Sequence, residues 1–112
     1  MKLLTQEIIR SLPPIGSNSE KDPADIPIIC KFFTPWSSWS HFVTEGEPVL
    51  DDETGEPTGE YLFFGFVIGH FKELGYFVLS ELEEVNGPFG LKVERDLHFS
   101  GTLKEVMEGK KS

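Results

Sequence analysis

The side chains best suited to acid–base chemistry are the three histidines, His41, His70 and His98. Histidine changes its charge near neutral pH without help from its surroundings, so each one is a candidate general base. None stands in an HxH, HExxH or Cys–His spacing, and the sequence therefore indicates no metal site and no cofactor. A site that the three form only in the folded chain stays open, and the alternative is that they lie at strand edges or on the surface.

A second chemical feature is the cluster Glu94-Arg95-Asp96. On a strand, Glu94 and Asp96 share one face, and Arg95 points to the other, where its guanidinium can bind a carboxylate or phosphate through two hydrogen bonds. One alternative is thus a catalytic or ligand-binding pocket, with the candidate residues Glu73, Glu94, Arg95, Asp96 and His98. The other is a structural tie between Arg95 and the carboxylate of Glu73 or Glu45. No serine stands in a nucleophile elbow, and no glycine loop is of the kind that cradles phosphate.

The negative charge is concentrated in one stretch. The formal net charge is −9, and residues 45–60, EGEPVLDDETGEPTGE, contain seven acidic side chains and no basic one. The positions do not fit a calcium-binding loop, and a surface that imitates DNA needs its acids along a longer face. We expect a solvated hairpin loop, because turns require Gly, Pro and Asp. The chain has no basic patch, which predicts no direct binding of nucleic acid.

Trp36 and Trp39 stand three residues apart in TPWSSWS, close to His41. WSSWS matches a box of cytokine-receptor domains, but the chain has only two arginines and one cysteine, and it lacks the strand pattern of such domains. Two tryptophans at a strand entrance either pack in the core or serve as aromatic anchors of a protein interface. For an interface beside the acidic loop, the candidate binding residues are Trp36, Trp39, His41, Glu45, Asp51, Asp52 and Glu53.

The apolar pattern predicts the elements that position these side chains. Strands are expected over residues 26–33, 39–44, 61–69, 76–79 and 93–99, and helices over residues 5–12, 80–85 and 103–109. Residues 61–69 are apolar on both alternating sets, as in a central strand that is covered on both faces. Because the first four strands are joined by links that are too short or too polar for crossover helices, we expect an α+β fold. It would have an antiparallel sheet of four to five strands, with an N-terminal helix, a short helix after the fourth strand and a C-terminal helix.

Local signals mark the ends of these elements. Thr5 is placed to cap the first helix, and Ser80 with Glu83, and Thr102 with Glu105, have the spacing of a capping box. Residues 15–25 and 45–60 are expected to be mobile loops. The 112 residues predict a single domain, in which Cys30 is a small buried side chain. No stretch has the pattern of a signal peptide or a membrane span, so a soluble, cytoplasmic protein is expected.

Several blocks occur together in an order that resembles one bacterial family. They are KLLTQEI…LPP, KFFTPW, Trp39, TEGEP, YLFFGFV, KELGYFVLSELE and GPFGLKVERDLHF. They are similar to the domain of unknown function 2958 family, small proteins of bacterial plasmids, conjugative elements and phages. The resemblance covers nearly the whole chain and implies an accessory protein of a mobile element, without supplying a mechanism. Members often have proline where this chain has Lys92, which affects the shape of one turn.

The leading hypothesis is a non-enzymatic accessory protein of a mobile genetic element. It would bind a basic protein partner through the acidic loop and the adjoining aromatic side chains, and inhibition of a host defence enzyme is one version of this role. The alternative is a small enzyme or ligand-binding domain with its pocket around Arg95. A third interpretation is a subunit of a larger complex, and the sequence predicts no oligomeric state.

Overall fold

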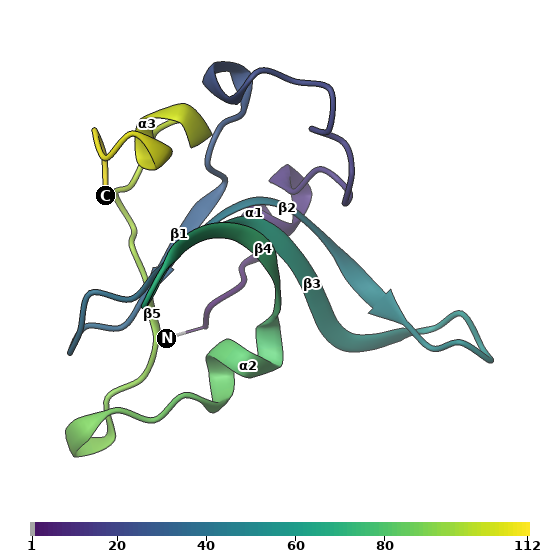
Figure 1. Ribbon diagram of the computed structural model, residues 1–112. Coiled ribbons are helices and arrows are strands. Elements are labelled where there is room, and N and C mark those ends of the chain that lie inside the picture. The colour runs from purple at the N-terminus through teal and green to yellow at the C-terminus, as the bar shows by residue number, and fades with distance from the viewer. Residues whose placement is uncertain (1) are drawn as a thin grey trace.

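The computed structural model describes residues 2–112 and shows one antiparallel five-stranded sheet with short helices around it (Figure 1). The strands are β1 (Cys30–Phe33), β2 (Ser40–Leu50), β3 (Pro57–Ile68), β4 (Lys72–Val78) and β5 (Glu94–Arg95). They lie side by side in the order β4-β3-β2-β1-β5. The helices are α1 (Gln6–Ser11), α2 (Leu79–Glu84) and α3 (Leu103–Met107), with the 3₁₀ turns η1 (Pro23–Asp25) and η2 (Pro88–Gly90). The predicted α+β class, with this placement of the three helices, is confirmed.

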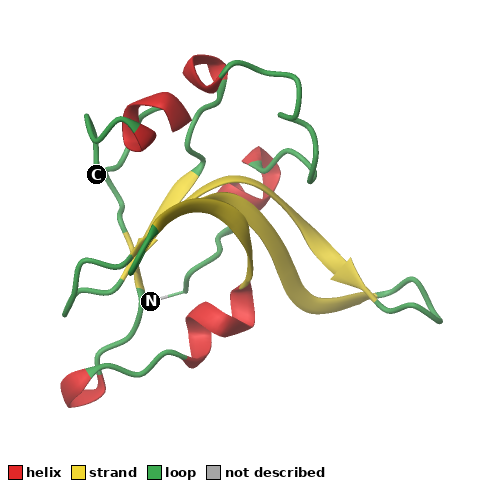
Figure 2. Ribbon diagram, in the orientation of Figure 1, coloured by secondary structure: helices red, strands yellow, loops and turns green. Residues whose placement is uncertain are grey.

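The sheet is covered on both faces, and each face has its own apolar cluster. Phe63 and Phe66 of β3 are buried on opposite faces, as the apolar pattern of this strand predicts. The larger cluster is built from Leu3, Leu4, Cys30, Phe32, Val43, Phe63, Phe77, Leu79, Leu82 and Val93. The smaller one is built from Ile26, Ile28, Phe42, Phe66, Leu103 and Val106. In Figure 2, α2 lies on one side of the curved sheet, and α3 and η1 lie on the other.

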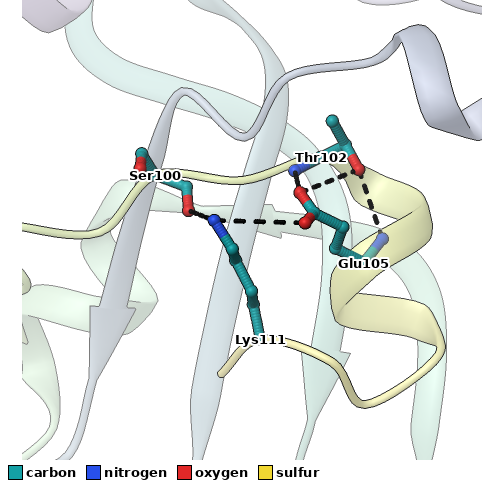
Figure 3. A network of polar contacts seen from close by, with 4 residues as sticks. All are labelled: Ser100, Thr102, Glu105 and Lys111. Carbon is teal, nitrogen blue, oxygen red and sulfur yellow. Dashed lines mark hydrogen bonds and ion pairs between the residues drawn. The ribbon is translucent and has the colours of Figure 1, made fainter.

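Two of the three predicted helix caps are present. The Thr5 hydroxyl accepts the Ile8 N–H at 3.2 Å at the start of α1. At the start of α3, Thr102 and Glu105 form the complete capping box, and Lys111 lies 4.0 Å from the Glu105 carboxylate while it donates to the Ser100 carbonyl (Figure 3). The caps at Thr5 and at Thr102 thus provide acceptors for backbone N–H groups that have no partner within the helix.

The predicted Ser80–Glu83 capping box is wrong. Helix α2 begins at Leu79, and its N-cap is Val78, two residues before Ser80, without a side-chain hydrogen bond. Burial of Leu79 in the larger cluster fixes this start. The Ser80 N–H donates instead to the Glu60 carboxylate of β3 at 2.9 Å, and the hydrogen bonds from Ser80 lower the pKa of Glu60.

Several strands differ in length from the prediction. A loop is expected over residues 45–60, but the observed loop spans only residues 51–56, because β2 continues to Leu50 and β3 begins at Pro57. Likewise β4 begins at Lys72, four residues before the expected strand 76–79. The acidic and glycine residues there lie in strands because cross-strand hydrogen bonds form without an apolar side chain at each position. The expected strands 26–33 and 93–99 are longer than the observed strands β1 and β5. In these two stretches, the residues that pair in a continuous ladder are Cys30–Phe33 and Glu94–Arg95.

A bulge in β2 sets which side chains face which side. Val43 is opposite Gly65 and Glu45 is opposite Phe64, so Thr44 is an extra residue in the ladder. The extra residue places Glu45 on the same face as Phe64, whereas a regular strand would place it on the opposite face. The Thr44 hydroxyl donates to the Phe64 carbonyl at 3.0 Å and fills the gap in the ladder.

Candidate functional site

The most exposed feature is the hairpin of β2 and β3, whose outer part we call the acidic arm, residues 48–59. Every side chain of the acidic arm is exposed, and it extends away from all three helices (Figure 1). It carries Asp51, Asp52, Glu53 and Glu56 and no basic residue. The Asp51 carboxylate accepts the N–H groups of Thr54 and Glu53 at 3.0 and 2.9 Å, and these hydrogen bonds lower its pKa. The Asp51 carboxylate therefore stabilises the conformation of the turn at the tip of the acidic arm.

Glu45, a candidate for the binding surface, has a different position. It is only 4% exposed, and its two carboxylate oxygens accept the N–H groups of Gly16 and Asn18 at 2.9 and 2.7 Å. Glu47 accepts the Ile15 N–H at 2.9 Å in the same way. The segment that we expected to be a mobile loop, residues 15–25, is thus anchored at its start to β2 and contains the η1 turn.

Trp36 and Trp39 pack against glycines at the opposite end of β2 from the acidic arm. A Cβ atom on Gly69 would lie 2.4 Å from the Trp39 ring, and one on Gly87 would lie 2.5 Å from the Trp36 ring. Trp39 is 38% exposed and makes an edge contact with the His70 ring, with 5.0 Å between centroids. The two rings therefore tie together three turns of the chain, at 34–39, 69–71 and 86–91.

This placement separates the two halves of the expected binding surface. Strand β2 runs from Ser40, next to Trp39, to Leu50, at the acidic arm. At about 3.3 Å per residue its 11 residues span roughly 36 Å. The turn that precedes β2 and the hairpin that follows it lie at opposite ends of the sheet (Figure 1). The tryptophans of that turn and the acids of that hairpin therefore do not form one continuous surface.

His41 lies on the sheet face of the larger cluster. Its ring makes an edge contact with Phe77, with 4.8 Å between centroids. Burial lowers the pKa of His41 from 6.5 to about 4, so the ring is neutral at pH 7. It is opposite Phe32 on one side and Val67 on the other, and it serves as a packing residue of β2.

The pKa of His41 predicts how stability depends on pH. Because the folded pKa of about 4 is below the ordinary value of 6.5, the unfolded chain binds the proton first. The contribution of His41 is complete above the ordinary pKa and is lost as the pH falls towards the folded value. Between pH 7 and pH 5 we expect the wild type to lose about 2 kcal/mol more unfolding free energy than the variant His41→Phe. Urea denaturation of both proteins at the two pH values measures this difference, and equal losses would contradict it.

The alternative pocket is not assembled as the sequence suggested. Arg95 donates through Nη1 to the carbonyl oxygens of Lys2 and Leu3, at 2.6 and 2.8 Å, and so fastens the N-terminal segment to β5. Glu73 lies on β4, at the other margin of the sheet, with three strands between them. Four strand spacings of about 4.8 Å put these two residues roughly 19 Å apart. A tie between Arg95 and the Glu73 carboxylate is therefore out of reach.

Of the remaining residues of that cluster, Asp96 and His98 lie together, and Glu94 lies apart from them. The Asp96 carboxylate lies 3.9 Å from Lys31 Nζ and accepts the His98 N–H at 2.9 Å. Arg95 and Asp96 line a cavity of about 290 Å³ beside Cys30. His98 lines a neighbouring cavity of about 360 Å³ that Asp96 also borders and that Arg95 does not reach. Glu94 lines neither of these two cavities. The predicted burial of Cys30 is confirmed, and this burial raises the pKa of its thiol to about 12.

A cavity that the sequence does not indicate lies over β3 and β4, on the face of the smaller cluster. It measures about 300 Å³, and its walls include Phe64, Leu74, Tyr76, Ile26 and Leu103. Gly16, Asn18, Ser19 and Lys21 line one side of it. Glu45 holds this segment by accepting the N–H groups of Gly16 and Asn18. The contributing segments are distant in sequence, and the only local signal was the apolar alternation within β4.

Residues 2–112 contain no group of three His, Cys, Asp or Glu side chains that could hold a metal ion. Over the same residues, none of the helices has the length and apolar character needed to cross a membrane.

Comparison with known proteins identifies a family. Neither the curated proteins nor the solved structures include one that matches the chain. The family described as Protein of unknown function (DUF2958) matches residues 3–106, which is nearly the whole chain and includes every helix and strand except the last residue of α3. The chain therefore belongs to the DUF2958 family.

Proposed function

We propose that this chain is a non-enzymatic interaction protein that binds a basic protein partner through the acidic arm. The observation that carries the proposal is the exposure of all residues from 48 to 59 on a hairpin that extends beyond the packed part of the molecule. The arm carries four negative charges and no positive one. A charge of one sign on a projecting element attracts an oppositely charged partner and increases the rate of encounter.

The arm also has an apolar component. Val49 and Leu50 are 37% and 50% exposed, next to Asp51 and Asp52. Protein interfaces combine an apolar centre with a polar rim, and this combination supports binding of a protein rather than of a small cation. Because the tryptophans lie at the far end of β2, the proposal rests on the arm alone.

The kind of partner that we propose is suggested by a resemblance. Resemblance to proteins of plasmids, conjugative elements and phages supports an accessory role in a mobile genetic element. Enzymes that handle nucleic acid need basic surfaces, and such surfaces are complementary to the arm. A host defence enzyme of this kind, inhibited by the bound arm, is the version that we favour.

The test compares two variants, in each of which three acidic side chains are replaced by their uncharged amides. In the arm variant Asp51, Asp52 and Glu53 become Asn, Asn and Gln, which keeps the side-chain oxygen of residue 51 as an acceptor. The control variant changes Glu81, Glu83 and Glu84, three exposed acids of α2, to Gln and so alters the net charge equally. We expect capture of a basic protein from host lysate at low salt to fall at least about tenfold with the arm variant only.

Salt provides a second criterion. Binding by exposed charges weakens as ionic strength rises, because the Debye length shortens. The wild type and the control should lose the partner as salt increases, and the arm variant should be insensitive. Equal capture by all three proteins at both salt concentrations would show that the arm is not the binding surface.

A further inference from the structure

Strand β4 forms one margin of the sheet, and its outer side has no backbone partner within residues 2–112. In register it pairs with β3 from Lys72 to Val78, without a shift or bulge. No other backbone hydrogen bond of the described chain involves these seven residues. An open, regular strand without proline is a template for pairing with another strand.

A row of apolar side chains crosses the sheet from β2 to β4, and its last member, on β4, is exposed to solvent. Phe42, Phe66 and Leu74 are consecutive cross-strand neighbours on β2, β3 and β4. Their exposure rises along the row from 0% to 5% to 43%. The next row, Phe64 with Tyr76, ends in the same way, with Tyr76 64% exposed. Both rows would continue if another strand lay beside β4.

From this we infer that two copies of the chain pair antiparallel through β4 and form a continuous ten-stranded sheet. With a two-fold axis at Gly75, all seven residues overlap, and Leu74 of each copy lies opposite Tyr76 of the other. Lys72 then faces Val78, and Glu73 faces Phe77, so no like charges are opposite each other. The pairing is isologous, as in most homodimers.

The register also completes the cavity described above. Leu74 and Tyr76 line the side of the 300 Å³ cavity that is formed by the edge strand. In the dimer, the second copy places its own Tyr76 and Leu74 directly across from them. Each cavity would then have a wall from both chains.

Gly75 allows a test that is specific for this register. A Cβ atom at Gly75 would meet nothing within 4 Å, and its φ is not in the left-handed range, so the monomer accepts a side chain there. In the proposed dimer the two residues 75 face each other at the axis, where Cβ atoms are about 5 Å apart. Gly75→Glu therefore sets two carboxylates against each other, whereas Gly75→Gln has the same shape without the charge.

We would measure the mass in solution by sedimentation equilibrium from micromolar to millimolar concentration. The monomer mass is 12.6 kDa, and we expect wild type and Gly75→Gln to approach twice that value. For Gly75→Glu we expect a dimer dissociation constant at least about tenfold higher, because like charges directly opposite each other destabilise a strand pair. An equimolar mixture of Gly75→Glu and Gly75→Lys should form mixed dimers in preference to either homodimer.

The second variant is Tyr76→Glu. Residue 76 points to the opposite sheet face from residue 75, and a charge there, in place of the exposed aromatic ring, should also weaken the dimer. Circular dichroism checks that each variant is folded. A wild type that stays at the monomer mass at every concentration would overturn the inference, even if β4 pairs with a foreign peptide. A Gly75→Glu variant that dimerises as well as the wild type would overturn it too, because the contact would then lie elsewhere.

Discussion

Replacement of Gly65 by alanine is expected to remove a large part of the stability of the protein. A Cβ atom at this position would lie 1.9 Å from the carbonyl oxygen of Phe42, and 3.1 Å from the Cα atom of Val43. These are backbone atoms of the neighbouring strand β2, so no change of side-chain conformation relieves the clash. The strands β2 and β3 would have to separate beside the bulge at Thr44, in the centre of the sheet. We expect a loss of at least about 4 kcal/mol, against a total stability of about 5 to 15 kcal/mol for a typical domain.

The matched control is Gly75→Ala. Gly75 is the cross-strand neighbour of Gly65 on β4, and a Cβ atom there meets nothing within 4 Å. The same chemical change should alter the unfolding free energy by no more than about 0.5 kcal/mol. Urea denaturation followed by circular dichroism compares the two. A Gly65→Ala protein within about 1 kcal/mol of the wild type would show that β2 and β3 do not approach as closely as described.

The second large effect is expected for Glu45→Ala. The substitution leaves the N–H groups of Gly16 and Asn18 without their acceptor, and that of Asn18 is buried. A buried donor without a partner costs about 1 to 3 kcal/mol, so we expect a total loss of about 2 to 4 kcal/mol. Glu45→Gln keeps one acceptor oxygen and should lose less. Glu56→Ala, which removes an exposed carboxylate of the arm, is the control for the change of charge.

Hydrogen exchange locates the effect within the chain. If the carboxylate anchors residues 15–18, the amides of Gly16 and Asn18 should exchange much faster in Glu45→Ala, while amides of β3 keep their rates relative to global unfolding. Unchanged exchange at these two amides would mean that Glu45 does not hold the segment. The cavity next to it would then also lack its fixed wall.

The local parts of the structure could be predicted from the sequence. Thr5, and Thr102 with Glu105, act within one turn of a helix, so spacing alone identifies them. The burial of both faces of β3 follows from its apolar residues on both alternating sets. Where a capping signal competed with burial, as at Ser80, burial of Leu79 determined the start of the helix.

The non-local parts could not be predicted. Glu45 resembles an exposed acid in an acidic stretch, but the bulge at Thr44 turns it towards a segment 27 residues earlier in the chain. The partners of Arg95 are carbonyl groups more than 90 residues away, which no side-chain pattern reveals. The separation of the tryptophans from the acidic arm depends on the length of β2. The two acids, the glycine and the proline of residues 45–48 conceal that length, because a projecting hairpin needs no apolar face.

The packing of both tryptophans at one end of the sheet gives the molecule a natural optical reporter with a defined location. Trp36 and Trp39 lie against Gly87 and Gly69, and the acidic arm contains no tryptophan. Tryptophan emission therefore senses the solvent around three turns and is blind to events at the arm. A partner that binds the arm should leave the emission maximum unchanged, whereas a partner that covers Trp39 should shift it to shorter wavelength. The emission of the unlabelled protein thus reports whether a bound partner covers the tryptophan end of the sheet.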